Sequence, residues 1–333
     1  MTENKICPFF GFCGGCQYQN LSEEAYVDKK NLFIRRAFAD YGLDVDLNSI
    51  QSVPLGTRRR ASFAYMGSHL GYNARKSHQI VEITECRLLK PEIVSFLPTL
   101  RQWTEKLGGR GDVFVLATPY GLDIHIRPDR PEKPTLERLE LLTGFAGDSA
   151  VARLIYQGTP VAEKVRLPIL PDDFLQPSPE GEKVLIDLML DHIGSARHAV
   201  DLFCGNGTFT RPLIERGIRV KGYDTSESVQ NLGTFGLKRD LFRSPLLPEE
   251  MTDLDLIVLD PPRAGAKAQI EQIAQTQVPK IIMISCAPKT AARDCRILTD
   301  AGWKIQSITP VDQFRWSDHI EIVCILDKTI EPL

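Results

Sequence analysis

Four short apolar runs alternate with helical stretches in the C-terminal part of the chain, and this alternation limits the fold more than any other feature. The runs cover residues 198–203, 219–223, 254–259 and 280–285. Strands that alternate with helices predict a parallel sheet, because parallel strands need a crossover connection between them. Near the ends of these runs stand side chains that can do chemistry: Asp201, Asp224, Asp260 and Cys286. Ligands bind beyond the carboxyl ends of such strands, so we expect these residues to share one site.

The segment from 61 to 166 has a different pattern, with short strands and turns. Leu122, Ile124 and Ile126 alternate with polar residues, and Pro119-Tyr120-Gly121 precede them as a turn. This alternation after a turn is typical of a β-hairpin. The length of 333 residues also favours two domains. We therefore predict a smaller antiparallel α+β region beside an α/β domain.

Two features predict where the chain divides. Ser22, followed by two glutamates, is a helix start, and apolar pairs continue the helix to about Gly42. The prolines between Leu167 and Pro179 predict a domain boundary. The predicted parts are a loop at 1–20, a helix at 21–42 that we expect to pack on the catalytic domain, a central region at 43–168 and a catalytic domain at 169–333.

Composition and charge exclude several classes of protein. The chain is 43% hydrophobic and 25% charged, as expected for a globular protein with a core. Its N-terminus lacks the apolar run of a secretory signal and no membrane-spanning run follows, which predicts a cytoplasmic protein. The net charge of -3 gives no general attraction to nucleic acid, so RNA binding requires a local patch. Residues 51–90 are locally basic and supply the candidate RNA contacts Arg58, Arg59, Arg60, Arg75 and Lys76.

A glycine-containing turn follows the first apolar run and predicts a nucleotide-type ligand. The stretch from Asp201 to Phe209 includes Phe203, Gly205 and Thr208, and Asp224 ends the next run 19 residues after Gly205. Glycines let a ligand approach the backbone, and an acid at this place accepts hydrogen bonds from ribose hydroxyls. An adenosine cofactor explains the pattern, while a plain strand-to-helix turn and NAD remain alternatives at this point.

The choice between hydride transfer and the different kinds of methyl transfer depends on two motifs, Asp260-Pro261-Pro262-Arg263 and Cys286. Hydride transfer has no need for this motif together with a cysteine. Amine methyltransferases follow their Pro-Pro pair with an aromatic residue, whereas Arg263 follows here, and the Pro-Cys pair common in cytosine-5 methyltransferases is absent at Cys286. Methylation of a uracil carbon fits best.

These motifs together resemble the RNA (uracil-5-)-methyltransferase family. Matching segments follow in the family's order, namely 174–178, 201–207, 260–263, 285–286 and 314–321. The resemblance implies a class I, Rossmann-like S-adenosylmethionine methyltransferase domain in which Gln176 touches the donor. Ala287 stands where the family usually has asparagine, and Arg315-Trp316-Ser317 replaces its usual Pro-His-Thr.

The resemblance also implies roles for individual residues. Cys286 would add to uracil C6, which makes C5 nucleophilic enough to attack the donor's methyl group. Glu321 would then remove the C5 proton. We expect Asp260 to contact the uracil or the donor's amino group, with Arg263 either nearby or in a structural salt bridge. We expect His319 to make a structural hydrogen bond. The target base must leave its stack to reach these groups.

Cys7, Cys13 and Cys16 lie close together near the N-terminus, and Cys86 follows the basic segment. In a cytosolic chain such cysteines favour metal binding over disulfides, and four thiolates suit zinc or an iron–sulfur cluster. The Cys-x5-Cys-Gly-Gly-Cys spacing is similar to that of bacterial family members that hold a [4Fe–4S] cluster, and the resemblance implies the same cluster here.

The resemblance implies 5-methyluridine formation by a monomeric enzyme, and we expect 23S rRNA as the RNA, with tRNA as an alternative. Cys7 comes so early that we expect no extra N-terminal β-barrel (TRAM) domain. A non-catalytic iron–sulfur RNA-binding or folding factor is a further alternative. Intact Cys286, Glu321 and donor motifs argue against it.

Overall fold

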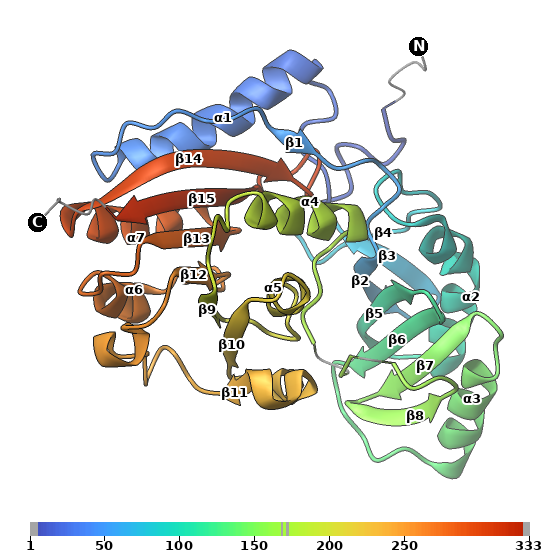
Figure 1. The fold of residues 1–333 in the computed structure, drawn as a ribbon. Helices are drawn as coiled ribbons and strands as arrows, with labels where there is room; N and C mark the ends of the chain where they lie inside the picture. The colour runs from blue at the N-terminus through green and yellow to red at the C-terminus, as the bar shows by residue number, and fades with distance from the viewer. Residues whose placement is uncertain (1–5, 168, 171–172, 329–333) are drawn as a thin grey trace, which may run out of the picture.

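A computed structural model describes residues 6–167, 169–170 and 173–328 of the chain. It contains two sheets that lie side by side (Figure 1). The boundary predicted at Pro168 and the first five residues of the predicted N-terminal loop lie outside the described residues. Within the described ranges, no helix is long and apolar enough to cross a membrane.

The larger sheet, here called the catalytic sheet, has the strand order β1-β14-β15-β13-β12-β9-β10-β11. All its pairs are parallel except those of β15, which runs antiparallel to β13 and β14. The four predicted apolar runs form β9, β10, β12 and β13, as expected. The strands are β1 Gln51–Ser52, β9 His198–Leu202, β10 Arg219–Asp224, β11 Gly236–Lys238, β12 Leu256–Leu259, β13 Lys280–Ser285, β14 Trp303–Asp312 and β15 Glu321–Lys328.

Helices cover both faces of the catalytic sheet. Ile270 and Ala291 pack on one face in a core shared with Phe38, while Leu185 and Leu213 pack on the other. Strands between two helical layers are buried on both sides, which explains their continuous apolar runs. The covering elements are α4 Pro179–Leu190, α5 Thr210–Glu215, α6 Lys267–Ile273 and α7 Pro288–Asp300, with 3-10 turns at Glu227–Phe235 and Pro248–Met251.

Helix α1 (Glu23–Ala39) packs on the catalytic sheet although it precedes the central region in sequence (Figure 1). Ser22 caps it as its sequence predicts, with Oγ accepting a hydrogen bond from the Ala25 N–H at 3.2 Å. Ile34 and Phe38 are fully buried in the core that α6 and α7 share. Full burial of one such side chain contributes roughly 1.5–3 kcal/mol.

The smaller sheet, here called the central sheet, has the order β4-β3-β2-β5-β6-β7-β8. Helices α2 (Pro91–Leu107) and α3 (Leu136–Ala146) pack on one face of it. The predicted hairpin is present, since β5 and β6 pair antiparallel from Thr118 and Gly121 onward. The strands are β2 Arg60–Met66, β3 His69–Asn73, β4 Ile80–Val81, β5 Arg110–Thr118, β6 Gly121–Pro128, β7 Val151–Tyr156 and β8 Thr159–Glu163.

One pair in the central sheet departs from the predicted antiparallel pattern. Strands β6 and β7 are parallel, with Ile124 opposite Leu154. The chain between them contains α3, which provides the crossover that a parallel pair requires. The strand periodicity in the sequence is the same for both pairings, so it gave no sign of this exception.

Candidate active site

The carboxyl ends of the catalytic strands surround one pocket of about 480 Å³. Its wall includes every residue predicted to bind the donor or to act on the base. These residues are Gln176, Phe203, Gly205, Thr208, Asp224, Asp260, Cys286 and Glu321. They come from the ends of β9, β10, β12 and β13, the start of β15 and the segment before α4. The fold therefore joins segments far apart in sequence in one place.

The turn after β9 holds the acid at the end of β10. The Gly205 N–H donates to Asp224 Oδ2 at 2.9 Å, and the Ser226 N–H donates to Oδ1 at 2.7 Å. Gly205 has φ +53°, which glycine adopts freely, while Phe203 adopts φ +64° at a cost. Each carboxylate oxygen keeps a second lone pair for a ligand hydroxyl. This geometry suits the ribose of an adenosine group.

An aromatic pair on the pocket wall was missed from sequence. Phe242 faces Phe203 with ring centroids 5.4 Å apart, and both line the pocket. Phe242 lies in an irregular segment after β11 and is 46% exposed, so no periodic pattern identified it. Apolar rings beside an acid are typical of a site for a flat base with a polar sugar.

Asp260 and Gln176 both line the pocket and are hydrogen-bonded to each other. Gln176 Nε2 donates to Asp260 Oδ2 at 3.2 Å, and Gln176 Oε1 accepts from Gln313 Nε2 at 2.9 Å. Burial raises the pKa of Asp260 to about 7, and the charges of Asp201 and Asp224 add to this. Asp260 is therefore partly protonated near neutral pH, and it can donate as well as accept a hydrogen bond.

Cys286 and Glu321 line the same pocket, and the charge of Glu321 acts on the Cys286 thiol. Burial, together with the carboxyl groups of Glu321 and Asp260, raises the pKa of the Cys286 thiol to about 11, whereas Arg263 acts to lower it. Burial also raises the pKa of Glu321 to about 8, with Asp260 adding to the shift and Arg263 opposing it. Both groups are thus mainly protonated at neutral pH. Cys286 would have to lose its proton to act as a nucleophile, and Glu321 would have to lose its proton to act as a base.

The loop that leads into Glu321 is held by α1, an arrangement that the sequence did not suggest. Lys30 is 2% exposed, and its Nζ donates to Asp312 Oδ1 at 3.2 Å and to the carbonyl of His319. Tyr26 donates its hydroxyl hydrogen to Asp312 Oδ2 at 2.6 Å and accepts from the Trp316 N–H at 2.8 Å. These bonds fix both ends of the loop.

His319 lies at the rim of the site, with Nε2 3.4 Å from the Arg263 guanidinium. Burial lowers the pKa of His319, and the neighbouring cations Arg263 and Lys30 lower it further. The imidazole is therefore neutral near pH 7. It does not supply a positive charge to the pocket.

Cys7, Cys13, Cys16 and Cys86 line one cavity of about 100 Å³, and all four are free thiols. Burial raises the pKa of Cys13 and Cys86, and of Cys16 to about 11, and neighbouring thiols raise all three further. Over the described ranges, no group of three or more Cys, His, Asp or Glu side chains is arranged to hold a metal ion. The [4Fe–4S] cluster therefore stays a prediction.

The predicted RNA-contacting cations fall into two sets. Arg59 donates to Glu182 at 2.6 Å and to the Gln176 carbonyl at 2.9 Å, and Arg60 donates to the Leu175 carbonyl at 2.9 Å. Arg58 lies over the Phe314 ring at 6.0 Å and lines the cysteine cavity. Arg75 and Lys76 are exposed in the turn between β3 and β4. The triplet thus makes contacts within the protein, whereas the turn is open to solvent.

Known proteins that resemble this chain are RNA methyltransferases. The family described as tRNA (Uracil-5-)-methyltransferase matches residues 237–329. An uncharacterized RNA methyltransferase of Brucella suis biovar 1 is 36% identical over 98% of this chain and 85% of its own length. Another, from Agrobacterium fabrum, is 35% identical over 96% of this chain and 83% of its own.

A solved structure shows the same fold over nearly the whole molecule. The Pyrococcus abyssi tRNA (uracil-54, C5)-methyltransferase, in complex with S-adenosyl-L-homocysteine, superposes with a TM-score of 0.73 at 20% identity. The match covers 95% of this chain and 86% of that one. The predicted class I methyltransferase fold is thereby confirmed, and the chain belongs to the RNA (uracil-5-)-methyltransferase family.

Proposed function

We propose that this protein uses S-adenosylmethionine to methylate C5 of a uridine in RNA, with Cys286 as nucleophile and Glu321 as base. The observation that carries the proposal is the single pocket that holds the donor residues, Cys286 and Glu321 together. Asp224 would accept hydrogen bonds from the donor's ribose, and the Phe203 and Phe242 rings would enclose its adenine.

The proposed reaction follows from the chemistry of these two side chains. Cys286 first loses its proton to water, and its Sγ then forms a bond to C6 while the electrons of the C5–C6 double bond move toward the C4 carbonyl. When bound, S-adenosylmethionine would supply the methyl group that C5 attacks, and the electrons of the broken sulfur–methyl bond would stay on sulfur in S-adenosylhomocysteine. Glu321 then accepts the proton from C5, the double bond re-forms, and the sulfur of Cys286 leaves C6.

Arg263 and Asp260 set the protonation of this pair. Arg263 lowers the pKa of both Cys286 and Glu321, while Asp260 raises both. We propose that the cation eases formation of the thiolate and stabilises the negative charge that develops on the uracil ring. Because all these residues come from one chain, the proposal requires only a monomer.

We propose 23S rRNA as the substrate. The support is the similarity of Cys7, Cys13, Cys16 and Cys86 to the spacing in the iron–sulfur 23S rRNA enzymes of the family. A tRNA substrate is the second candidate, favoured by the description of the matching family and by the substrate of the Pyrococcus abyssi protein.

Mass spectrometry of RNA from a strain lacking the gene tests both parts of this proposal. We expect one 5-methyluridine to be missing from 23S rRNA, to return with the wild-type gene and not to return with Cys286→Ala. If 5-methyluridine were instead missing from tRNA, tRNA would be the substrate and the proposed reaction would stand. Full restoration by Cys286→Ala would refute the mechanism.

We also propose that the four cysteines hold a [4Fe–4S] cluster. The support is a donor set of four thiols on one cavity, which is a ligand set that such clusters use. Iron, sulfide and zinc analysis of anaerobically purified protein tests it. About four irons and four sulfides per chain are expected, whereas bound zinc, or no metal, would refute the cluster.

A further inference from the structure

The face of the central sheet opposite α2 and α3 contains a second cavity, of about 220 Å³. Val113 and Val115 of β5 point into the helix-covered core, so Phe114 and Leu116, which alternate with them, point the other way. Phe114 on β5 lies directly opposite His125 on β6, and Leu116 lies opposite Asp123. Arg127 follows on the same face, and all five residues line the cavity.

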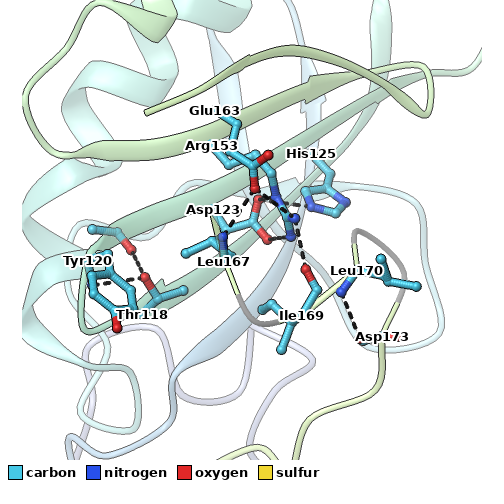
Figure 2. A network of polar contacts seen from close by, with 11 residues as sticks. Thr118, Tyr120, Asp123, His125, Arg153, Glu163, Leu167, Ile169, Leu170 and Asp173 are labelled. Carbon is cyan, nitrogen blue, oxygen red and sulfur yellow. Dashed lines mark hydrogen bonds and ion pairs between the residues drawn. The ribbon is translucent and has the colours of Figure 1, made fainter. Parts of the chain in front are cut away.

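A buried ion pair fixes the floor of this cavity (Figure 2). Arg153 donates to both oxygens of Asp123, at 2.9 and 2.6 Å, and His125 Nε2 lies 3.1 Å from Asp123 Oδ1. Burial alone would raise the pKa of Asp123, but its bonds from Arg153 and His125 hold the pKa below the usual value. Asp123 therefore stays charged and paired.

The same arginine fastens the segment that closes the cavity. Arg153 Nη1 donates to the Ile169 carbonyl at 2.9 Å, and the Leu167 N–H donates to Glu163 on β8 at 3.2 Å (Figure 2). Ile169 is 9% exposed and lines the cavity. One wall of the cavity is thus tied to the sheet by specific bonds.

A single stretch of chain separates this cavity from the active site. Asp173 and Leu175 line the cavity, whereas Phe174 and Gln176 line the catalytic pocket. The Arg60 guanidinium lies 5.1 Å from the centre of the Phe174 ring and donates to the Leu175 carbonyl. Arg60 lines the cavity, so it contacts both sides of this wall.

The lining of the cavity has the chemistry of a nucleotide site. The Arg127 guanidinium lies over the Phe114 ring at 4.8 Å, which makes a flat cationic surface. Bases stack on arginine and aromatic planes, and cations attract the phosphate beside them. A volume of about 220 Å³ is small for a ligand pocket and suits a single base.

We infer that this cavity binds a nucleotide that flanks the target uridine while that uridine occupies the catalytic pocket. The inference rests on the proposed function, because it requires an RNA substrate. The wall at residues 173–176 places the two sites next to each other, as neighbouring nucleotides of one strand require. The RNA backbone would cross this wall beside Arg60.

Binding of fluorescein-labelled hexauridylate, followed by fluorescence anisotropy with S-adenosylhomocysteine present, tests the inference. Arg127→Ala removes an exposed side chain and should weaken binding about tenfold, the effect of losing one stacked base. His125→Gln should weaken it less. Arg110→Ala is the matched control, because Arg110 is an exposed arginine of the same sheet, on the neighbouring strand β5, and it pairs with Asp129 at 3.0 Å. It should bind within about twofold of wild type.

A scan with an abasic nucleotide at successive positions of hexauridylate makes the test specific. At one position of the RNA, the abasic substitution should weaken binding to the wild-type protein and leave the affinity of Arg127→Ala unchanged. Equal affinities of wild type and Arg127→Ala, or no binding by wild type, would overturn the inference. Failure of the proposed function has a different signature, since methyl transfer that survives Cys286→Ala would leave these binding differences intact.

Discussion

The molecule contains two groups of cysteines whose surroundings differ. Cys286 is a single thiol that faces the carboxyl groups of Glu321 and Asp260 and the Arg263 cation. Cys7, Cys13, Cys16 and Cys86 line one cavity. Burial is the main cause that raises the pKa of Cys286 and of Cys16, to about 11 in each case. The neighbouring groups, and not the thiol pKa, therefore distinguish a proposed nucleophile from proposed metal ligands.

Residues beside Cys16 and Cys86 contact the loop that precedes Glu321. The N–H groups of Gln17 and Tyr18, next to Cys16, donate to the Trp316 carbonyl. Arg87, next to Cys86, lies 5.6 Å from the Trp316 ring centre. The cysteine cavity thus supports the loop from one side, while Lys30 supports it from the other.

The largest expected effect separates the two groups directly. Cys286→Ser should lower methyl transfer by about 10³-fold or more, because it removes the attacking thiolate. Cys16→Ser should lower it far less, because Cys16 lies outside the pocket. Single-turnover transfer of a radiolabelled methyl group measures both. Equal losses of methyl transfer in Cys286→Ser and Cys16→Ser would contradict a nucleophilic role that belongs to Cys286 alone.

The next effect concerns the support of the loop. Lys30→Met should destabilise the protein by about 3 kcal/mol, because it leaves the Asp312 carboxylate buried without its cation. Urea unfolding measures this loss. Asp312→Asn in the same chain should recover part of it, and a Lys30→Met protein as stable as wild type would contradict the role of this ion pair.

A change of pH should change kcat/KM through the protonation of Glu321. Glu321 has a raised pKa of about 8, so below that pH it carries a proton and cannot accept another. We expect kcat/KM to rise by at least about tenfold per pH unit between pH 6 and 7.5, because Glu321 must be deprotonated and loss of the Cys286 proton adds to the rise. Arg263→Gln removes a cation that lowers this pKa, so its profile should move to higher pH, while Arg263→Lys should move less. A flat profile would exclude Glu321 as the base.

The smallest effect is expected at the exposed turn beside the cysteine cavity. Arg75→Ala with Lys76→Ala should weaken RNA binding by about threefold to tenfold at low salt and reduce the slope of log affinity against log salt by about two. Filter binding at several salt concentrations measures both. Arg59→Ala should also lower stability, because Arg59 bonds to Glu182 and to the segment before α4.

The residues of the pocket were easier to predict from sequence than the contacts of Lys30 and Arg59 that hold the surrounding segments. The carboxyl ends of parallel strands meet at one edge of a sheet, so strand pattern alone brought Asp224, Asp260 and Cys286 together. The bond between Lys30 and Asp312 joins residues 282 positions apart, and no local pattern marks a buried lysine. The contacts of Arg59 likewise depend on how the two sheets pack, which composition does not reveal.

Trapping of the covalent intermediate tests the central claim most directly. Glu321→Gln cannot accept the C5 proton, so RNA should remain attached to the enzyme after methyl transfer. Intact-mass and peptide mass spectrometry under denaturing conditions should find a methylated uridine on Cys286, with Glu271→Gln, an exposed site, as the control without adduct. An adduct on another residue, or full turnover by Glu321→Gln without any adduct, would contradict the account.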